Sequence, residues 1–388
     1  MTVHRVIASK WLVLPILALL GAMVMSNTLP AAASTPAGDA CTPPDSFTGD
    51  AYETAWRVMV AALCPVNRNR YPYVVWENWI EQSDLFPEDP SKGLVVPNSG
   101  GTNPGHPLHG SPLTFIRHHL LGSPDDNCNK ASVPPPNDPN RIICEEVRDN
   151  GAAEDYIAGR GFWQRSGQQE VAERGGLIQF PKPAVEIKAD WVVLHSCANL
   201  PTGVHVEKLG PTCYALAGMH LISKLISNWI WSTFEPQNLS TNPERCVVLG
   251  CQDPFGSVPP TSKGGPGGTT KLSAQLAALM TQANLDPIWR NYRLDGVQTT
   301  FLTRSGKPWL LGNSIIEGEN AGVPLTQSSC ITCHDVSSIK NDGTDGITLL
   351  TSNPVGNPAP LPSPDWIRRD FVWTLGLACP GSMMQDCD

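Results

Sequence analysis

The fold is decided by the stretch VEIKADWVV (Val185–Val193), in which apolar and polar side chains alternate. This period of two is typical of a β-strand with one face against a core. Two more strands are predicted at Tyr214–Leu225 and Asn228–Phe234, and the second begins NWIWSTF, rich in aromatic and β-branched residues. Because a tight connection near Ser227 joins them, the strands should pair in a central antiparallel sheet.

Outside these strands, apolar residues recur at helical spacing and predict helices that flank the sheet. The helical segments are Asp50–Leu63, Trp76–Phe86, Glu145–Ala158 and Leu272–Ala283. Leu94–Arg141 is rich in Gly, Pro, Asn and Ser and predicts a long loop, and KGGPGG at 263–268 predicts a flexible break. The predicted fold class is therefore α+β, with long Pro- and Gly-rich loops.

The composition fits a packed core joined by irregular loops. Hydrophobic residues make up 41% and charged residues 16% of the 388 residues, with 37 Pro and 34 Gly. Lys and Arg number 27 and Asp and Glu 36, which gives a net charge of −9. An acidic chain without basic runs lacks the surface that releases counterions from nucleic acid, so we expect no nucleic-acid partner.

Residues 1–33 have the pattern of a secretory signal peptide, because a basic start precedes an apolar run from Trp11 to Met25 and the small residues Ala31–Ala33 follow. The alternative is an uncleaved membrane anchor, but Pro15 interrupts a run shorter than the ~20 residues that a spanning helix needs. We expect residues 34–388 to form one periplasmic or secreted α+β domain that carries no later membrane span. Its parts would be a helical and loop region at about 45–180, a sheet region at about 181–260 and a C-terminal cofactor-attachment region at about 272–388.

Twelve cysteines in one chain are typical of an oxidising compartment, where disulfides persist. Two of them belong to a separate motif, which leaves 12 − 2 = 10, an even number compatible with five bridges. Pairing of chain neighbours predicts disulfides between Cys246 and Cys251, Cys379 and Cys387, and Cys197 and Cys213. A disulfide between Cys128 and Cys144 would constrain the long loop. The pattern leaves the connectivity open, because a disulfide needs spatial proximity.

The chemistry-bearing motif is CITCH (Cys330–His334), the C-x-x-C-H arrangement of covalent c-type haem attachment. On one helical turn, residues three apart share a face, so the thiols of Cys330 and Cys333 can bond to one porphyrin edge. His334 would then be the proximal iron ligand, and its other ring nitrogen should donate to a carbonyl or carboxylate. One motif predicts one haem c, so the expected cofactor is a single covalently attached haem.

Two other uses of these cysteines fit less well. A thioredoxin-like redox pair belongs in a βαβ context, and the Gly- and Pro-rich flanks give none. A structural zinc site needs a second Cys/His pair, and the chain has no other C-x-x-C. About 300 residues precede the motif in the exported chain and 388 − 334 = 54 follow it, an unusual place for the haem of a small electron carrier.

The distal iron ligand stays open between His220 and Met219, which strand alternation places on opposite faces. In the simpler interpretation, neither residue binds iron: Met219 packs in the core and His220 is hydrogen-bonded. Met383 and Met384, some fifty residues after the motif, are a further option, and His195 and His205 are weaker candidates. A second metal site is conceivable at His106, His109, His118 and His119. Glu186 and Lys188 share a strand face and would form either a surface ion pair or the polar wall of a haem pocket.

Four segments resemble a bacterial family of exported cytochrome c proteins. They are FPKPAVEIKADWVVL (Phe180–Leu194), the YALAGMHLISK and NWIWSTFEP runs within Tyr214–Pro236, WRNYRLDGVQ (Trp289–Gln298), and GNSIIE with SSCITCH (Gly312–His334). The resemblance implies haem on Cys330 and Cys333 with His334 as ligand, and it implies no substrate. A departure is Phe234-Glu235-Pro236, where such proteins tend to have Phe-Glu-His.

A shorter likeness is to the c-type haem enzymes that oxidise hydroxylamine, in which a sheet precedes the haem motif and a lysine is linked to the porphyrin. DFVWTL (Asp370–Leu375) is similar to their ending, and this analogy would assign the lysine role to Lys188.

Three functions follow as hypotheses. The first is a periplasmic monohaem c-type cytochrome that transfers single electrons to or from a redox partner protein or a small molecule. The second is a haem enzyme with an open sixth position that acts on peroxide or a hydroxylamine-like molecule, with His220, Lys188 or Glu186 as acid–base groups. The third is a haem-bearing binding or structural protein without turnover. A side chain in the sixth position would separate the first from the second.

Overall fold

The computed structural model describes residues 39–68, 71–87, 94, 128–209, 211–237, 246, 249–261, 270–346 and 355–378, and these belong to one compact unit, Pro36–Asp388. Several predictions fall outside the described residues. They are the signal peptide at 1–33, most of the long loop with His106, His109, His118 and His119, the break at 263–268, and Cys379, Met383, Met384 and Cys387.

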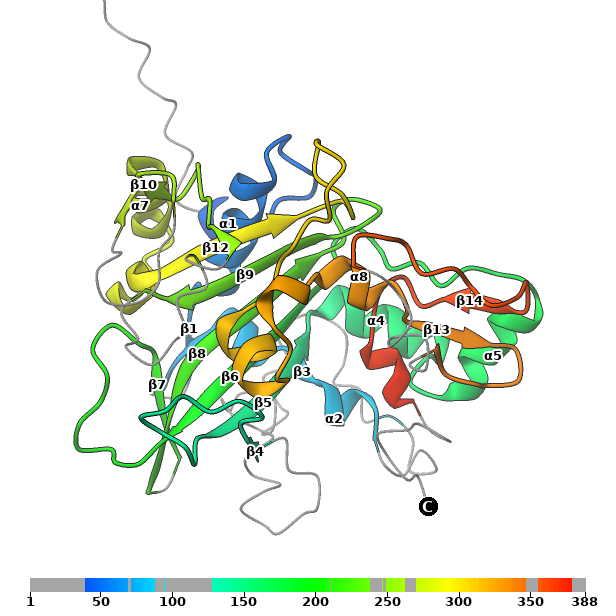
Figure 1. Cartoon of the computed structure of the whole chain (residues 1–388), viewed down its shortest axis with the longest axis horizontal. Coiled ribbons are helices and arrows are strands. Elements are labelled where there is room, and N and C mark those ends of the chain that lie inside the picture. The colour runs from blue at the N-terminus through cyan, green and yellow to red at the C-terminus, as the bar shows by residue number, and fades with distance from the viewer. Residues whose placement is uncertain are drawn as a thin grey trace, which may run out of the picture. The chain divides into compact units, whose positions relative to one another are not determined.

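An antiparallel sheet of eight strands forms the centre of the unit and confirms the α+β class (Figure 1). Its strand order is β12 (Tyr292–Gln298), β9 (Ile230–Pro236), β8 (Thr212–Ser223), β6 (Val185–Leu194), β5 (Ile142–Asp149) and β3 (Ile80–Glu81). The short strands β4 (Cys128–Lys130) and β7 (Val206–Leu209) pair with β5 and β8. The strands predicted from alternation correspond to β6, β8 and β9, with ends that differ by a few residues.

One face of the sheet packs on α1 (Ala51–Ala62) and α7 (Ala274–Gln282), which confirms the first and last predicted helices. Both helices begin at a capping side chain, because Asp50 accepts from the backbone of Tyr52 and Glu53, and Ser273 accepts from Leu276. The core between them includes Met219 of β8, and Trp56 of α1 meets Phe234 of β9 edge to face at 5.0 Å.

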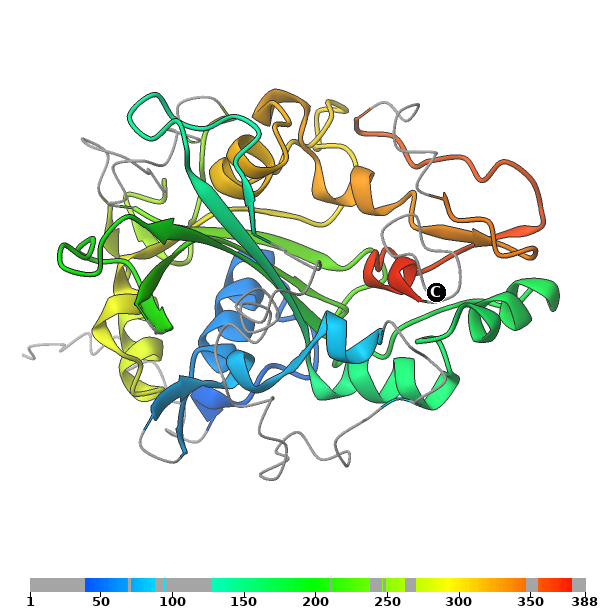
Figure 2. The ribbon, with the colours of Figure 1, turned by 90° about the horizontal axis from the view of Figure 1, so that it is seen from below.

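The opposite face of the sheet is covered by the C-terminal part of the chain. Figure 2 shows the π-helix η5 (Ser314–Asn320) and the short helix α8 (Cys330–His334) on the far side of the sheet from α1. A second buried cluster on this side joins Ile222 and Trp231 of the sheet to Cys330 and Ile331. The helices α4 (Gly151–Arg160) and α5 (Arg165–Glu173) and the hairpin of β13 (Ser338–Lys340) with β14 (Trp366–Arg368) extend this layer.

The remaining elements are short. They are η1 (Asp39–Cys41), β1 (Pro65–Arg68), β2 (Tyr71–Val74), η2 (Val75–Asn78), α2 (Gln82–Leu85), β10 (Ser257–Val258), β11 (Lys271–Leu272), η4 (Pro287–Asn291), η6 (Leu325–Gln327) and η8 (Thr374–Leu377).

Two predicted helices are wrong in part. Trp76–Phe86 contains η2, β3 and α2 instead of one helix, since Ile80 and Glu81 pair with the end of β5. Glu145–Asp149 belongs to β5, because these residues complete the ladder with β6, and α4 starts only after Asn150, whose side chain caps it by accepting from Ala153. Tertiary pairing therefore overrode local helical spacing at both sites.

The expectation that β6 is half-buried is also wrong. Glu186 and Asp190 on its polar face are buried, and Lys188 between them is partly buried. The π-helix η5 covers that face, where Asn320 donates to Asp190 at 2.9 Å. Charged side chains that alternation assigns to solvent therefore lie between the two layers.

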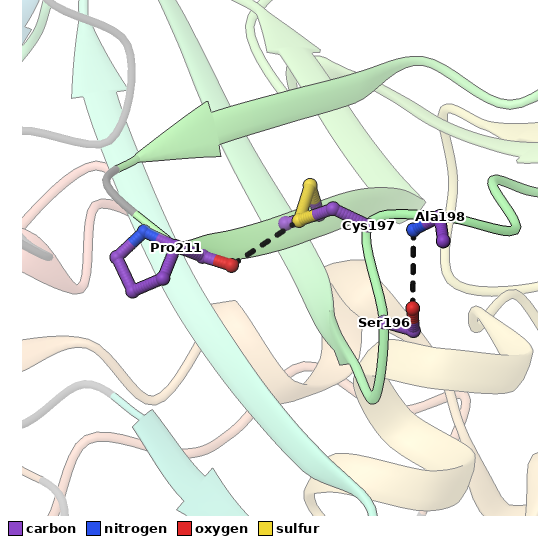
Figure 3. The surroundings of a disulfide bond; sticks show 5 residues. Ser196, Cys197, Ala198 and Pro211 are labelled. Carbon is purple, nitrogen blue, oxygen red and sulfur yellow. Dashed lines mark hydrogen bonds between the residues drawn. A yellow bond between two sulfur atoms is a disulfide. The ribbon is translucent and has the colours of Figure 1, made fainter.

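Four disulfides join described cysteines. The predicted pairs Cys197–Cys213, Cys246–Cys251 and Cys128–Cys144 are confirmed, and Cys41–Cys64 ties η1 to the residue directly before β1. Figure 3 shows the surroundings of the bridge at Cys197, whose Sγ lies 3.3 Å from the Pro211 carbonyl oxygen. The four bridges fit an oxidising, exported location. Among the described helices, none has the length and apolar character needed to cross a membrane.

Candidate functional site

The CITCH motif forms α8 on the covered face of the sheet. Of the ten described cysteines, Cys330 and Cys333 keep their thiols while the other eight are disulfide-bonded. Cys330 is buried and Cys333 is exposed. The helical turn places these residues three apart on one side, as covalent attachment to one porphyrin edge requires.

Gln298, at the end of β12, anchors the start of α8. Its Nε2 donates to the Ser329 hydroxyl at 2.9 Å and to the Trp309 carbonyl at 2.5 Å, while its Oε1 accepts from the Ile331 amide at 3.0 Å. The Gln298 side chain is fully buried. The Gln298 side chain thus accepts from an amide that the first turn of the short helix leaves open and donates to the Ser329 hydroxyl just before it, and these contacts fix α8 against the sheet edge.

His334 is oriented by the backbone of a distant turn. Its Nδ1 donates to the carbonyl oxygen of Phe371 at 2.8 Å, which leaves Nε2 as the nitrogen with a lone pair. The imidazole also contacts the ring of Trp231, at 4.6 Å between centroids. Burial, and then the charges of Lys188 and His220, hold the pKa of His334 down to about 3, so the ring is neutral at neutral pH.

The turn that presents the Phe371 carbonyl is conformationally strained. Asp370 and Phe371 have φ of 52° and 70°, in the left-handed region that disfavours side chains with a Cβ. Buried Lys224 of the β8–β9 connection pairs with Asp370 at 2.6 Å, and the other oxygen of Asp370 accepts from the Phe180 amide at 2.7 Å. The ion pair and this hydrogen bond hold the turn, because such strain persists only where the surroundings enforce it.

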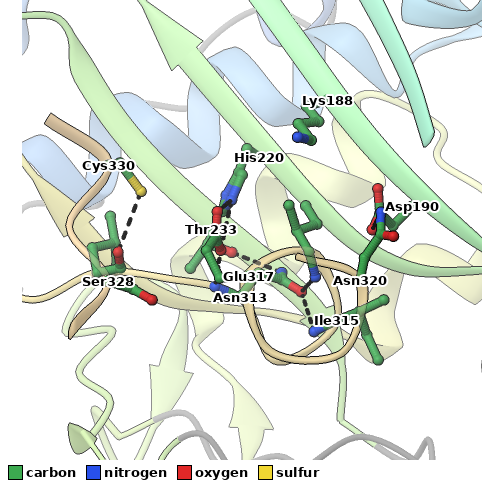
Figure 4. A network of polar contacts seen from close by, with 12 residues as sticks. Lys188, Asp190, His220, Thr233, Asn313, Ile315, Glu317, Asn320, Ser328 and Cys330 are labelled. Carbon is green, nitrogen blue, oxygen red and sulfur yellow. Dashed lines mark hydrogen bonds and ion pairs between the residues drawn. The ribbon is translucent and has the colours of Figure 1, made fainter. Parts of the chain in front are cut away.

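Three charged or polar side chains lie together on the same side of the sheet as Cys330, and they come from β6, β8 and η5 (Figure 4). Lys188 and His220 are direct cross-strand neighbours, and Nε2 of His220 lies 2.9 Å and 3.1 Å from the two carboxylate oxygens of Glu317. Glu317 also accepts from the Asn313 amide at 2.5 Å, while Lys188 pairs with Glu145 of β5 at 2.8 Å. We name Lys188, His220 and Glu317 the charged trio.

The electrostatics of this trio favour fixed charges. Burial raises the pKa of Glu317, but the charge and hydrogen bond of His220 outweigh it and lower that pKa to about 2. Burial lowers the pKa of Lys188, but Glu145 and Asp190 outweigh it, so its pKa lies above the usual range. At neutral pH Glu317 is therefore an anion and Lys188 a cation.

The trio lies within electrostatic range of the motif. Lys188 and Glu317 keep 31% and 24% of their side-chain surface accessible, and Cys333 is exposed. The charges of Lys188 and Glu317 both act on Cys333 and on His334. The trio and the motif therefore belong to one neighbourhood on this side of the sheet.

The local backbone makes room for these contacts. Asn313 caps η5 by accepting from Ile315 and Ile316, and its amide donates to the Thr233 hydroxyl of β9 at 2.8 Å. A Cβ at Gly218 of β8 would lie 2.4 Å from the Asn313 side-chain oxygen, so only glycine permits this approach. A π-helix is uncommon and often marks a functional site.

The structure separates the predicted candidates. His220 lies on the same side of the sheet as the motif, whereas Met219 packs in the core with α1 on the other side, as alternation predicted. Glu186 lies one β6 repeat from Lys188 but does not pair with it, since Lys188 pairs with Glu145. His195 binds Asp138 at the surface, and His205 lies beside Trp191 and Trp289 of the α1-side core.

Sequence reasoning missed Glu317, Gln298 and the Phe371 carbonyl. GNSIIE precedes the motif and contains Glu317, but nothing local in it indicates that the carboxylate reaches β8.

Comparison with known proteins leaves the site to be interpreted from its own geometry. No family model, curated protein or solved structure matches the chain.

Proposed function

We propose that this chain is a c-type haem protein of the bacterial periplasm, with one haem on Cys330 and Cys333 and His334 as iron ligand. The observation that carries the proposal is the hydrogen bond from His334 Nδ1 to the Phe371 carbonyl, which leaves Nε2 available for a metal. The donor set fits such a group, because two thiols and an imidazole lie on one helical turn and the thiol of Cys333 is exposed. A bound c-type haem would supply one-electron redox chemistry at iron.

In this proposal the chain's own residues bind, orient and cover the group. Gln298 fixes the attachment helix, and Phe371 fixes the imidazole. Trp231 and Ile331, both buried, exclude water from the sheet side of the motif. Transfer of single electrons with a redox partner protein or a small-molecule donor or acceptor is the function expected from these parts.

The test is a haem stain of denatured protein that was exported with haem-attachment machinery. A Cys330→Ser/Cys333→Ser variant should lose covalent haem, while a Cys197→Ser/Cys213→Ser variant, which also lacks two cysteines, should keep it. Staining that persists without Cys330 and Cys333, or no haem bands in the wild-type absorption spectrum, would refute the proposal.

A second function is favoured by the charged trio. Acid–base chemistry on a small molecule such as peroxide or a hydroxylamine-like compound needs polar groups beside the iron ligand, and Lys188, His220 and Glu317 lie there. The ionised Glu317 would hold a proton on His220 Nε2, and the cation at Lys188 would attract an electron-rich substrate.

Spectra under carbon monoxide separate the two functions. A reduced protein that binds carbon monoxide has an open sixth position and favours the enzyme, whereas an indifferent low-spin spectrum favours the electron carrier. His220→Ala should alter the spectrum in either case, but Met219→Leu should not, because Met219 lies on the other face of the sheet.

A further inference from the structure

Glu77, His205 and Glu207 converge on one point away from the CITCH motif. Nε2 of His205 lies 3.1 Å from a Glu207 oxygen and 3.4 Å from Oε1 of Glu77. One ligand atom from each residue lies within 4.8 Å of the others. Three side chains from η2, the residue before β7, and β7 itself therefore present three donor atoms to a common centre.

Hydrogen bonds among the three side chains do not satisfy all of their polar atoms. Glu77 is 1% exposed, yet its Oε1 has no hydrogen-bond partner of acceptable geometry, and the same holds for His205 Nε2. A buried carboxylate oxygen without a hydrogen bond is costly, so a positive group is expected there. That group is either a protonated His205 ring or a cation held between the three side chains. The two atoms point toward each other at 3.4 Å without the alignment that a shared proton would need.

The spacing suits a metal ion. Zinc binds histidine nitrogen and carboxylate oxygen at about 2.0–2.2 Å, which places neighbouring ligands of a tetrahedral site about 3.3–3.5 Å apart. The separations of 3.1 Å and 3.4 Å at His205 are close to that edge length. An imidazole among the donors favours zinc and similar transition metals over magnesium or calcium.

The donors are held in place before any ion binds. The second Glu77 oxygen accepts from the Val74 amide at 3.0 Å. The backbone amide of His205 donates to the Tyr292 hydroxyl at 3.1 Å, and its ring stacks on Trp289 at 4.7 Å. Side-chain exposures of 16% for His205 and 24% for Glu207 leave the ion a path from solvent.

We propose that Glu77, His205 and Glu207 form a binding site for one zinc-like divalent transition-metal ion. The ion would tie η2 to β7 and so connect the chain before the sheet with the sheet's short outer strand. The site is separate from the proposed haem iron, because His205 packs on Trp191 and Trp289 of the α1-side core.

The test uses the full exported chain stripped with a chelator and titrated with zinc chloride by calorimetry. A Cys330→Ser/Cys333→Ser background keeps the motif thiols from binding zinc. Glu207→Gln and His205→Gln should each weaken this binding at least about tenfold, the low end of the loss that outer-shell partners alone cause. The matched control is His195→Gln, which removes an exposed histidine that also faces a carboxylate, and it should leave the affinity unchanged.

A second readout is the thermal midpoint. Zinc should raise it in the wild-type and His195→Gln chains, and not in Glu207→Gln, whereas magnesium should have no effect in any of them. Circular dichroism of each variant without metal shows whether it folds. If His205→Gln does not fold, Glu207→Gln still tests the site, because Glu207 is partly accessible. Equal zinc binding by wild-type and Glu207→Gln would overturn the site and leave His205 as a protonated ring between two carboxylates.

Discussion

His220 of β8 and Glu317 of η5 lie 97 residues apart in the chain, and the imidazole Nε2 contacts both carboxylate oxygens of Glu317, at 2.9 Å and 3.1 Å. This contact ties the π-helix to the central sheet beside the CITCH motif. It also explains why Glu317 stays ionised in surroundings that would otherwise protonate it.

Glu317→Gln should destabilise the fold. The amide keeps an acceptor for Asn313 but loses the charge that His220 faces. Breaking a fully buried pair costs about 3–5 kcal/mol, and the partial exposure of Glu317 reduces this to about 1–3 kcal/mol. Urea denaturation measures the change, and Glu170→Gln, in an exposed helical pair with Arg174, should change stability by less than about 0.5 kcal/mol. Equal losses in the two variants would contradict the coupling.

Gln298→Leu should loosen the attachment helix. It leaves the Ile331 amide without its acceptor and the Trp309 carbonyl without a donor, at a cost of about 2–4 kcal/mol for two buried groups. On the proposed function, the yield of covalently stained protein should fall as well. Gln327→Leu makes the same change at an exposed position near the motif and should leave both quantities unaltered.

Lys224→Met should release the strained turn at Asp370 and Phe371. The buried Asp370 carboxylate would lose its cation, which costs about 3–5 kcal/mol in comparable sites. Lys224→Met/Asp370→Asn removes both charges and should recover at least about 1 kcal/mol of that loss in a double-mutant cycle. Additive single effects would show that the pair does not hold the turn.

Glu154 should make stability fall as pH rises. Burial, and then the charge of Asp155, raise the pKa of Glu154 to about 7, so between about pH 4.5 and 7 the folded protein binds more protons than the unfolded chain. The contribution of the protonated Glu154 carboxyl to stability is fully present below the pKa of the unfolded chain. It is lost as the pH rises through the folded pKa of about 7. Glu154→Gln should reduce this slope, to which Glu186 and Glu319 also contribute because their pKa values are raised to about 7 as well. The variant should gain about 1–2 kcal/mol at pH 8, less than the full ~3 kcal/mol because the group is partly solvated.

Thermal denaturation between pH 4 and 8 measures this slope. Asp155→Asn, an exposed change on the same helix, should keep most of it. A Glu154→Gln profile with the same slope as the wild type would contradict the assignment to Glu154.

Much of the sheet could be predicted because its signals are local. Each of these signals lies within about a dozen consecutive residues. They are the alternation at β6, the aromatic and β-branched run of β9, and the capped helices α1 and α7. The helix predicted from Glu145 failed because β5 is stabilised by its ladder with β6, some forty residues further along the chain. Alternation also placed Met219 and His220 on opposite faces of the sheet. What each face contacts, α1 for Met219 and η5 for His220, depends on the packing of the layers.

The sequence by itself determined the CITCH motif and the strand faces, because each depends on residues close together in the chain. It suggested three of the four described disulfides as pairs of chain neighbours, but spatial proximity decided them. The tertiary structure alone decided what surrounds the motif. His334 meets Phe371 across 37 residues, Ile331 meets Gln298 across 33, and Glu317 meets His220 across 97. Such contacts arise when two layers pack, and no local period or spacing records which carbonyl, amide or carboxylate the packing brings to a given side chain.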